Sequence, residues 1–435
     1  MSLYSQLFYS NEIQELFTDS QSIRKMLQVE SALAQAQAHN NLFAKSISDA
    51  ISAVCSNGEI DIDQLKNDIP LGGSAAIPLV KQLTRKVAFV NEEAAKYVHF
   101  GATSQDIVDT ALVLQIQEFL TWINAKTIVL EKQLVALTRE HQKTIMIGRT
   151  LLQHAKPTTF GYKTAAWLTA ISRSKERILE VQKRVEVVQL SGAVGNGNQA
   201  ISTRIQDEFA QILNLKTGFS WHSNRDNFAE LGSVLSILGG GLGKIAKDIS
   251  LLMQTEVAEV FEGAAEGKGG SSTMPHKRNP VVCAAILANT NRLPHLAATL
   301  LSALPQEHER SVGLWHSEWE VLVEIMQLTA GSVEKSIALL AGLEVNKDRM
   351  LANLELTNGL IYAENVSLAL TKKIGKAASH ELIEKACKKA IIENRHLKSI
   401  ILELNTDLSD IDDLFNPKNS IGLSIELINQ LLEKY

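Results

Sequence analysis

Prolines are few in this chain of 435 residues, and their spacing constrains the fold more than any other feature. Only eight occur, and they leave three long stretches without any, at 79–156, 158–274 and 306–416. A proline inside a helix removes a backbone donor and clashes with the preceding turn, so it breaks the helix. The three proline-free stretches therefore leave room for very long helices.

Apolar residues return at helical spacing inside these stretches. The clearest case runs from Asp106 to Lys143, which holds no glycine, and the side chain of Asp106 can cap its start. We predict two further long helices, from Tyr162 to about Leu190 and from Asn224 to about Glu262, the latter in spite of glycines 239–241. Alternating strand-like runs are scarce. The predicted fold class is all-α, with a long central helical bundle.

Three helices of this length carry more apolar surface than they can bury against one another. The excess favours a bundle that neighbouring subunits extend. A monomeric helical repeat is the alternative, but the sequence shows no fixed period of the kind such arrays have. We expect three domains. These are a smaller helical domain at 1–105 that opens with an amphipathic helix from Ser22 to His39, a central long-helix domain at 106–350 and a second smaller helical domain at 351–435.

Composition and charge argue against several classes of protein. Hydrophobic residues make up 45% of the chain and charged residues 21%, which is ordinary for a globular protein. The formal net charge of −5 gives no electrostatic reason to expect a nucleic acid as partner, although a local site for a small anion is compatible with it. No uncharged apolar run is long enough for a membrane span, and Glu12 and Glu15 interrupt any signal peptide. The three dispersed cysteines fit a reducing compartment, so we expect a cytoplasmic protein.

Three segments without helical periodicity stand at the ends of the predicted helices: YVHFGATSQD (97–106), GRTLLQHAKPTTFG (148–161) and EGAAEGKGGSSTMPHKRNP (262–280). Helix ends expose unpaired N–H groups and a positive partial charge, so they suit anionic ligands. The third segment has four glycines followed by hydroxyl, cationic and amide side chains. By composition alone it fits a lid that holds a carboxylate, and equally a plain Gly/Ser-rich linker.

The run GSSTMPHKRNP in the third segment matches the signature GSSxMPxKxNP of the fumarase/aspartase superfamily over its whole length. HFGATSQD and GRTLLQHAKPTTFG resemble the other two signature regions, in the same order. The resemblance covers essentially the whole chain. It implies an all-helical subunit in a homotetrameric bundle, active sites assembled from three subunits, and no metal or organic cofactor.

Chemistry in this superfamily is addition to, or elimination across, a double bond next to a carboxylate, through a dianionic aci-carboxylate intermediate. The resemblance assigns the catalytic acid/base to Ser271, the first serine of the signature. A free serine hydroxyl is a very poor base, so this role demands donors that stabilise the alkoxide. The resemblance gives the substrate and intermediate contacts to Lys277, Asn279, Thr103, Ser104 and Gln153.

The second segment departs from the superfamily pattern. Adenylosuccinate lyases and fumarases have GRTH there, with a histidine implicated in protonating the leaving group or contacting the substrate, whereas this chain has Leu151. An amine leaving group needs a proton, but a carboxylate is stable as the anion. Loss of the histidine is therefore tolerable for an enzyme whose substrate adds its own carboxylate. His99 and His154 remain candidates for proton transfer or orientation, and structural roles for both stay open.

Further stretches, LFYSNEIQELF, TGFSWHSNRD and QEHERSVGLWHSEW, resemble 3-carboxy-cis,cis-muconate cycloisomerases. That resemblance implies a small tricarboxylate substrate, converted to 4-carboxymuconolactone. Adenylosuccinate lyase is the alternative, favoured by HFGATSQD and PTTFG. It is opposed by Leu151 and by residues 314–316, which replace a serine-rich phosphate-binding stretch. A catalytically silent structural protein on the same fold is the third possibility.

Two arginines are candidates for holding the extra substrate carboxylates, because arginine forms bidentate pairs with them. These are Arg310 and Arg225, and a surface salt bridge with Glu309 or Asp226 is the alternative for each. For the tryptophans at 315 and 319, four apart on a predicted helix, core packing is favoured over substrate stacking.

Overall fold

The computed structural model describes residues 3–57, 59–264, 270, 274, 277–404, 408 and 410–435. These residues form helices and two small two-stranded sheets, so the predicted all-α class is confirmed. The chain divides into two compact units. The first holds Met1–Ile128, Arg173–Leu242 and Ala285–Glu334, and the second holds Val129–Ser172, Gly243–Ala284 and Lys335–Tyr435. The three domains at 1–105, 106–350 and 351–435 stay a prediction.

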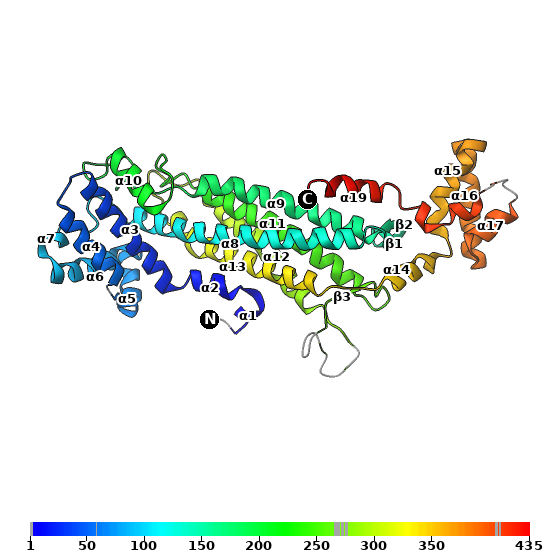
Figure 1. Ribbon diagram of the computed structural model, residues 1–435, viewed down its shortest axis with the longest axis horizontal. Coiled ribbons are helices and arrows are strands. Elements are labelled where there is room, and N and C mark those ends of the chain that lie inside the picture. Colours follow the sequence, from blue (N-terminus) through cyan, green and yellow to red (C-terminus); the bar gives the residue numbers. More distant parts are fainter. Residues whose placement is uncertain are drawn as a thin grey trace. The chain divides into compact units, whose positions relative to one another are not determined.

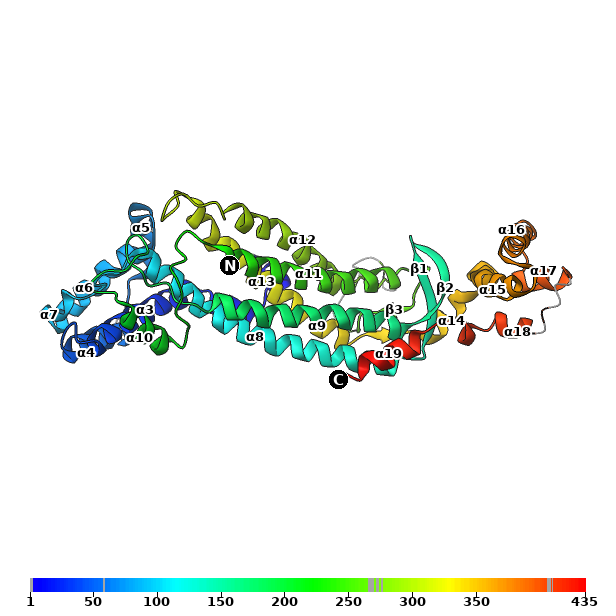
Figure 2. The same cartoon turned by 90° about the horizontal axis from the view of Figure 1, so that it is seen from above.

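Five long helices contribute segments to both units. They are α8 (Ser104–Glu140), α9 (Phe160–Val185), α11 (Asp226–Leu252), α12 (Val281–Ser302) and α13 (Leu314–Ala341). Within each unit, segments of α8, α9, α11 and α13 run side by side (Figures 1 and 2). The three long helices expected from periodicity are thus present as α8, α9 and α11, but α11 ends at Leu252, ten residues before the predicted end at about Glu262. The proline-free stretches gave no indication of α12, which continues through Pro294.

Glycines in α11 allow α12 to approach it closely. A Cβ atom added to Gly239 would lie 2.3 Å from Leu293 Cδ1, and one added to Gly232 would lie 2.5 Å from Leu300 Cδ1. Glycine normally weakens a helix interior. In α11 the missing side chains make room for leucines of α12, so the helix persists through its glycine run.

The first unit also holds α1 (Ser5–Phe8), α2 (Asn11–Leu16) and a group of shorter helices with its own apolar core. The group consists of α3 (Asp19–His39), α4 (Lys45–Asn57), α5 (Ile62–Gly72), α6 (Ala76–Val90), α7 (Glu92–Ala95) and, from later in the chain, α10 (Thr203–Leu213). In Figure 1 the green α10 lies beside the blue α3. Leu33, Leu79 and Phe209 are fully buried in this core.

Elements of the second unit include both small sheets. The hairpin of β1 (Ile145–Thr150) and β2 (Gln153–Thr159) overlaps the segment expected to be non-helical, 148–161, but begins three residues before it. Strand β3 (Val260–Phe261) pairs with β4 (Glu344–Val345). Towards the C-terminus follow α14 (Lys347–Leu354), α15 (Ala363–Ile374), α16 (Lys376–Glu393), α17 (Leu397–Glu403), α18 (Ile411–Leu414), α19 (Ser424–Leu432) and three short 3-10 turns. Helices α15 to α17 enclose a separate small core.

One described helix, α11, is long and apolar enough to cross a membrane. Its most apolar window has a mean hydropathy of 1.2, and 56% of that window is buried inside the protein. Burial of this kind is typical of the core helix of a bundle, and the packing of α12 against its glycines agrees with that role.

Candidate active site

The start of α8 is fixed by the buried carboxylate of Asp106. Helix α8 begins at Ser104, and the Asp106 side chain reaches back to accept the N–H of Thr103 at 3.0 Å, as the third residue of a capping box does. The same carboxylate accepts the N–H groups of Ser191 and Gly192, both at 2.9 Å. His222 Nε2 lies 3.1 Å from it. One buried charge therefore holds the turn that carries the predicted site residues Thr103 and Ser104 against the loop at 191–192.

Arg310 reaches the same turn. Its Nη2 donates to Thr103 Oγ1 at 2.8 Å and to the carbonyl oxygen of Ala193 at 3.3 Å. Its Nε is buried without a hydrogen-bond partner, and Arg310 forms no ion pair with any residue that the structure describes. The guanidinium thus lies beside Thr103 with its charge uncompensated by a described carboxylate, as a ligand-binding arginine would.

His99 is held by a buried glutamate. Its Nδ1 lies 2.7 Å from Glu30 Oε1, and the Glu30 side chain is 1% exposed. Burial lowers the pKa of His99, but the charge of Glu30, the hydrogen bond to it and the charge of Asp106 outweigh burial, so the pKa lies above its ordinary value. The backbone of His99 is left-handed, with φ 59°, a conformation that is uncommon for residues other than glycine. A strained histidine with a raised pKa thus precedes the Thr103 turn.

A glycine-rich loop beside this turn was missed by the sequence reasoning. Gly192, Gly195 and Gly197 all have left-handed backbones, with φ of 73°, 80° and 71°. The amide of Asn198 donates to the carbonyl oxygen of Gly101 at 2.8 Å, which ties the loop to the turn. The available signal was the run SGAVGNGN, because three glycines in six residues are typical of a loop that approaches other backbone closely.

The other predicted site residues belong to the second unit. Gln153 begins β2, pairs with Thr150 and is exposed. Lys277 is exposed and Asn279 is half-buried, just before α12. Ser271 lies outside the described residues. The structure therefore brings together His99, Thr103, Ser104 and Arg310 in one unit, and it places Gln153, Lys277 and Asn279 in the other.

Arg278, between Lys277 and Asn279, is firmly anchored. Its guanidinium donates to both carboxylate oxygens of Glu344 at 2.9 Å and to the carbonyl oxygen of Glu262 at 2.6 Å. It also lies 4.8 Å from the ring centre of Phe261. Because Arg278 is anchored on β3 and β4, the backbone on either side of it, which carries Lys277 and Asn279, is restrained.

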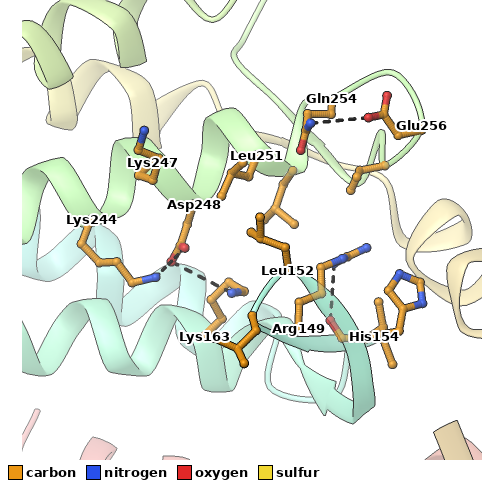
Figure 3. A pocket seen from close by; sticks show the side chains of 14 residues that line it. Arg149, Leu152, His154, Lys163, Lys244, Lys247, Asp248, Leu251, Gln254 and Glu256 are labelled. Carbon is orange, nitrogen blue, oxygen red and sulfur yellow. Dashed lines mark hydrogen bonds and ion pairs between the residues drawn. The ribbon is translucent and has the colours of Figure 1, made fainter.

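A cavity of about 610 Å³ in the second unit lies beside the β1–β2 hairpin, and Figure 3 shows its lining. Arg149 on β1 forms a bidentate pair with the fully buried Glu259, with distances of 2.9 and 2.7 Å. Burial and the charge of Arg149 lower the pKa of His154, although Glu259 acts in the opposite direction. His154 is therefore a neutral residue on the cavity wall near neutral pH.

Arg225 is engaged by two buried carboxylates, and neither of the expected surface partners holds it. It is 1% exposed and forms ion pairs with Asp109 and Glu318, each with a shortest distance of 2.6 Å. Burial lowers the pKa of Arg225, but the two carboxylates raise it by more than burial lowers it. The pKa therefore lies above its ordinary value. Trp315 is 3% exposed and donates to Asp109 at 3.0 Å, so the core-packing interpretation is confirmed for it.

Comparison with known proteins extends the resemblance from short segments to the whole chain. Residues 9–293 match the family described as lyase, and residues 359–431 match the family described as adenylosuccinate lyase C-terminus. The 3-carboxy-cis,cis-muconate cycloisomerase of Acinetobacter baylyi is 42% identical, over 99% of this chain and 98% of that protein. The protein of the same name from Pseudomonas aeruginosa is 41% identical, over 100% of this chain and 96% of that protein.

A solved structure agrees with the fold. The 3-carboxy-cis,cis-muconate lactonizing enzyme from Pseudomonas putida has a TM-score of 0.94 and 41% identity to this chain. The match covers 99% of this chain and 98% of the chain of that enzyme. The similarity predicted from the sequence segments is therefore confirmed over nearly the full length. The chain belongs to the lyase family, within the fumarase/aspartase superfamily.

Proposed function

We propose that this chain catalyses the reversible cycloisomerisation of 3-carboxy-cis,cis-muconate to 4-carboxymuconolactone. The observation that carries the proposal is the similarity, over nearly the whole chain, to relatives that bear this enzyme's name. Leu151 supports it, because it replaces the histidine with which amine lyases of the superfamily are expected to protonate or contact their substrate. A lactone forms from a carboxylate that is already ionised, so this reaction needs no such histidine.

In the proposed mechanism one substrate carboxylate adds to the diene and forms the new carbon–oxygen bond. The electron pair displaced from the double bond moves into a neighbouring carboxylate, which becomes the aci-carboxylate dianion. Lys277 and Asn279 would hold that group, and the anchoring of Arg278 on Glu344 supports a fixed position for both. Ser271 would deliver the proton to carbon and regain one from solvent.

The first unit offers the groups that would bind the rest of the substrate. Arg310 has a guanidinium whose charge no described carboxylate compensates, and it lies against Thr103 at the N-terminal end of α8. The helix dipole adds a positive partial charge there. Ser104 and His99, whose pKa is raised by Glu30, would complete an anionic-ligand site, and Gln153 would contact the substrate from the hairpin. A tricarboxylate suits such a set of donors.

We further propose that the enzyme is a homotetramer whose sites combine residues of several subunits. The similarity to the lyase family supports this arrangement, because the fumarase/aspartase superfamily assembles its active sites from three subunits. A mixture of Arg310→Ala and Lys277→Ala chains, unfolded and refolded together, tests it. If the two residues of one site come from different subunits, mixed tetramers regain part of the activity. If both come from the same chain, activity stays at the level of the separate variants.

The same similarity supports a place for the enzyme in the cytoplasm and in the protocatechuate branch of the β-ketoadipate pathway. Adenylosuccinate lyase, the alternative expected from the sequence, is not favoured by these relatives, although residues 359–431 match the family described as adenylosuccinate lyase C-terminus, and Leu151 opposes it. Parallel ultraviolet assays of the purified protein with both substrates distinguish them. Consumption of 3-carboxymuconate alone is expected, consumption of adenylosuccinate alone would refute the proposal, and inactivity on both would point to a silent homologue.

A further inference from the structure

Helix α12 begins without a local side-chain cap. Its first residue is Val281, and the carbonyl oxygen of Pro280 accepts the N–H of Ala284 at 2.9 Å, so Pro280 occupies the N-cap position. A side-chain oxygen at that position normally accepts the N–H group of the second or third helical residue. Proline has no side-chain acceptor, so the N–H groups of Val282 and Cys283 need a partner from elsewhere in the chain.

Glu262 supplies that partner from a distant position in the sequence. Its Oε2 accepts the N–H of Val282 at 3.2 Å, and its Oε1 accepts the N–H of Cys283 at 2.8 Å. The residue is 4% exposed. A carboxylate in this place also interacts favourably with the positive end of the helix dipole, which offsets part of the cost of its burial. Glu262 therefore caps α12 as an aspartate at the N-cap position would.

The carbonyl oxygen of Glu262 restrains the chain on the other side of Asn279. It accepts a hydrogen bond from Arg278 Nη2 at 2.6 Å, and the same guanidinium pairs with Glu344 on β4. Glu262 thus contacts the residue before Asn279 and the first turn of α12 after it. All of these residues belong to the second unit, so the arrangement is internal to that unit.

Asn279 is of the residue type that could take over the cap. Asparagine is among the strongest N-cap residues, and Asn279 lies one position before Pro280. Its side chain forms no hydrogen bond with any residue in the described ranges. The Asn279 amide is therefore available to a ligand, because Glu262 already holds the N–H groups that would otherwise compete for it.

We propose that Glu262 is a positioning residue for the reaction, which caps α12 and thereby keeps the Asn279 amide available for the aci-carboxylate. The proposal rests on the proposed function, in which Asn279 holds that group. Without the Glu262 carboxylate, the Asn279 side chain would turn towards the uncapped N–H groups and be withdrawn from the substrate. The aci-carboxylate forms only along the reaction, so loss of Glu262 should lower kcat and leave KM nearly unchanged.

The variant Glu262→Met tests the proposal on the intact oligomer. Methionine has a similar length and no strong acceptor for either N–H group. We expect kcat to fall at least about tenfold, since loss of one donor to a developing oxyanion costs about 100-fold or more. KM should change by less than about twofold, and Tm should fall by a few degrees because the cap is weakened. A wild-type kcat in this variant would overturn the proposal.

A double-mutant cycle with Asn279→Ala shows whether Glu262 acts through Asn279. If it does, Glu262→Met lowers kcat in the wild-type background and has little further effect in the Asn279→Ala background. A purely structural role of the cap would lower kcat by the same factor in both backgrounds. That additivity would overturn the proposal.

Asp61→Ala is the matched control for loss of a cap. Asp61 caps α5, where its Oδ1 accepts the N–H of Gln64 at 2.9 Å, and it belongs to the first unit. Its replacement should also lower Tm by a few degrees but leave kcat unchanged. If it lowers kcat as Glu262→Met does, the kinetic effect follows stability and the proposal fails.

Amide hydrogen exchange separates the proposal from the proposed function. The N–H groups of Val282 and Cys283 should stay partly protected in Glu262→Met, because Asn279 takes over the cap, and should lose this protection in Glu262→Met/Asn279→Ala. Equal protection in the two variants would overturn the proposal. If the wild type does not convert 3-carboxymuconate but the exchange pattern is as expected, the proposed function fails and the capping relation between Glu262 and Asn279 stands.

Discussion

Replacement of Arg225 by methionine should destabilise the fold strongly and leave substrate binding nearly unchanged. Arg225 donates five hydrogen bonds to Asp109 and Glu318, and all three side chains are at most 2% exposed. Removal of one partner from a buried ion pair leaves uncompensated charge and costs about 3–5 kcal/mol. Two carboxylates would be left facing each other, so we expect about 4 kcal/mol.

Arg310→Met is the matched comparison. Arg310 donates to two neutral oxygens and is half-buried, so its loss should cost only about 1 kcal/mol of unfolding free energy. If Arg310 binds a substrate carboxylate, KM should rise by about tenfold or more. The two arginines are equivalent candidates in the sequence. Arg225→Met should nevertheless lower the unfolding free energy and leave KM nearly unchanged, whereas Arg310→Met should raise KM with little loss of unfolding free energy.

Urea unfolding, followed by tryptophan fluorescence, measures the free energies, and the ultraviolet assay measures KM. The Arg225→Met result would refute the reasoning if the unfolding free energy changed by less than about 1 kcal/mol. A rise in KM as large as that of Arg310→Met would also refute it. Burial raises the pKa of Glu318 even in the presence of Arg225. The folded variant should therefore bind a proton more readily, and its stability should decrease as pH rises above the ordinary pKa of a glutamate.

Three further outcomes are expected. Ser271→Ala should keep the oligomeric state of the wild type and lose turnover, and near-normal kcat would remove Ser271 from the mechanism. Because the pKa of His99 is raised by Glu30 above 6.5, the stability from this pair should be present below that pH and lost as pH rises through the raised value. Glu30→Gln should flatten that dependence in pH-resolved urea unfolding, and an unchanged slope would contradict the pairing. Glu344→Gln should release Arg278 and lower kcat/KM severalfold with little change in melting temperature, and a wild-type kcat/KM would contradict the anchoring role.

The long helices could be predicted because their apolar spacing is a local property of the sequence. The hairpin could not, because the apolar run of β1 spans only 145–147 and Leu151-Leu152 is not a turn signal. Helix α12 was missed because Pro294 lies inside it, where packing against the glycines of α11 outweighs the local preference. Local patterns are reliable only where tertiary contacts do not override them.

For the site, the sequence indicated the Thr103 turn and Arg310 but could not separate Arg310 from Arg225. Both arginines have acidic neighbours in the sequence, and their actual partners lie 93 to 207 residues away. Partner choice at that separation depends on the tertiary fold. The role of Asp106 was also only partly predicted, since it does cap α8 but from inside the first turn, and it holds the loop at 191–192 as well.

The placement of α10 has a consequence for synthesis of the chain. The core around Leu33 and Leu79 is completed by Val188, Phe209 and other residues up to Leu213. A nascent chain that has not yet reached this point therefore leaves part of that apolar surface open to water. Folding of the N-terminal helices must wait for about half of the polypeptide to leave the ribosome. Fragments truncated before Val188 should expose apolar surface and aggregate.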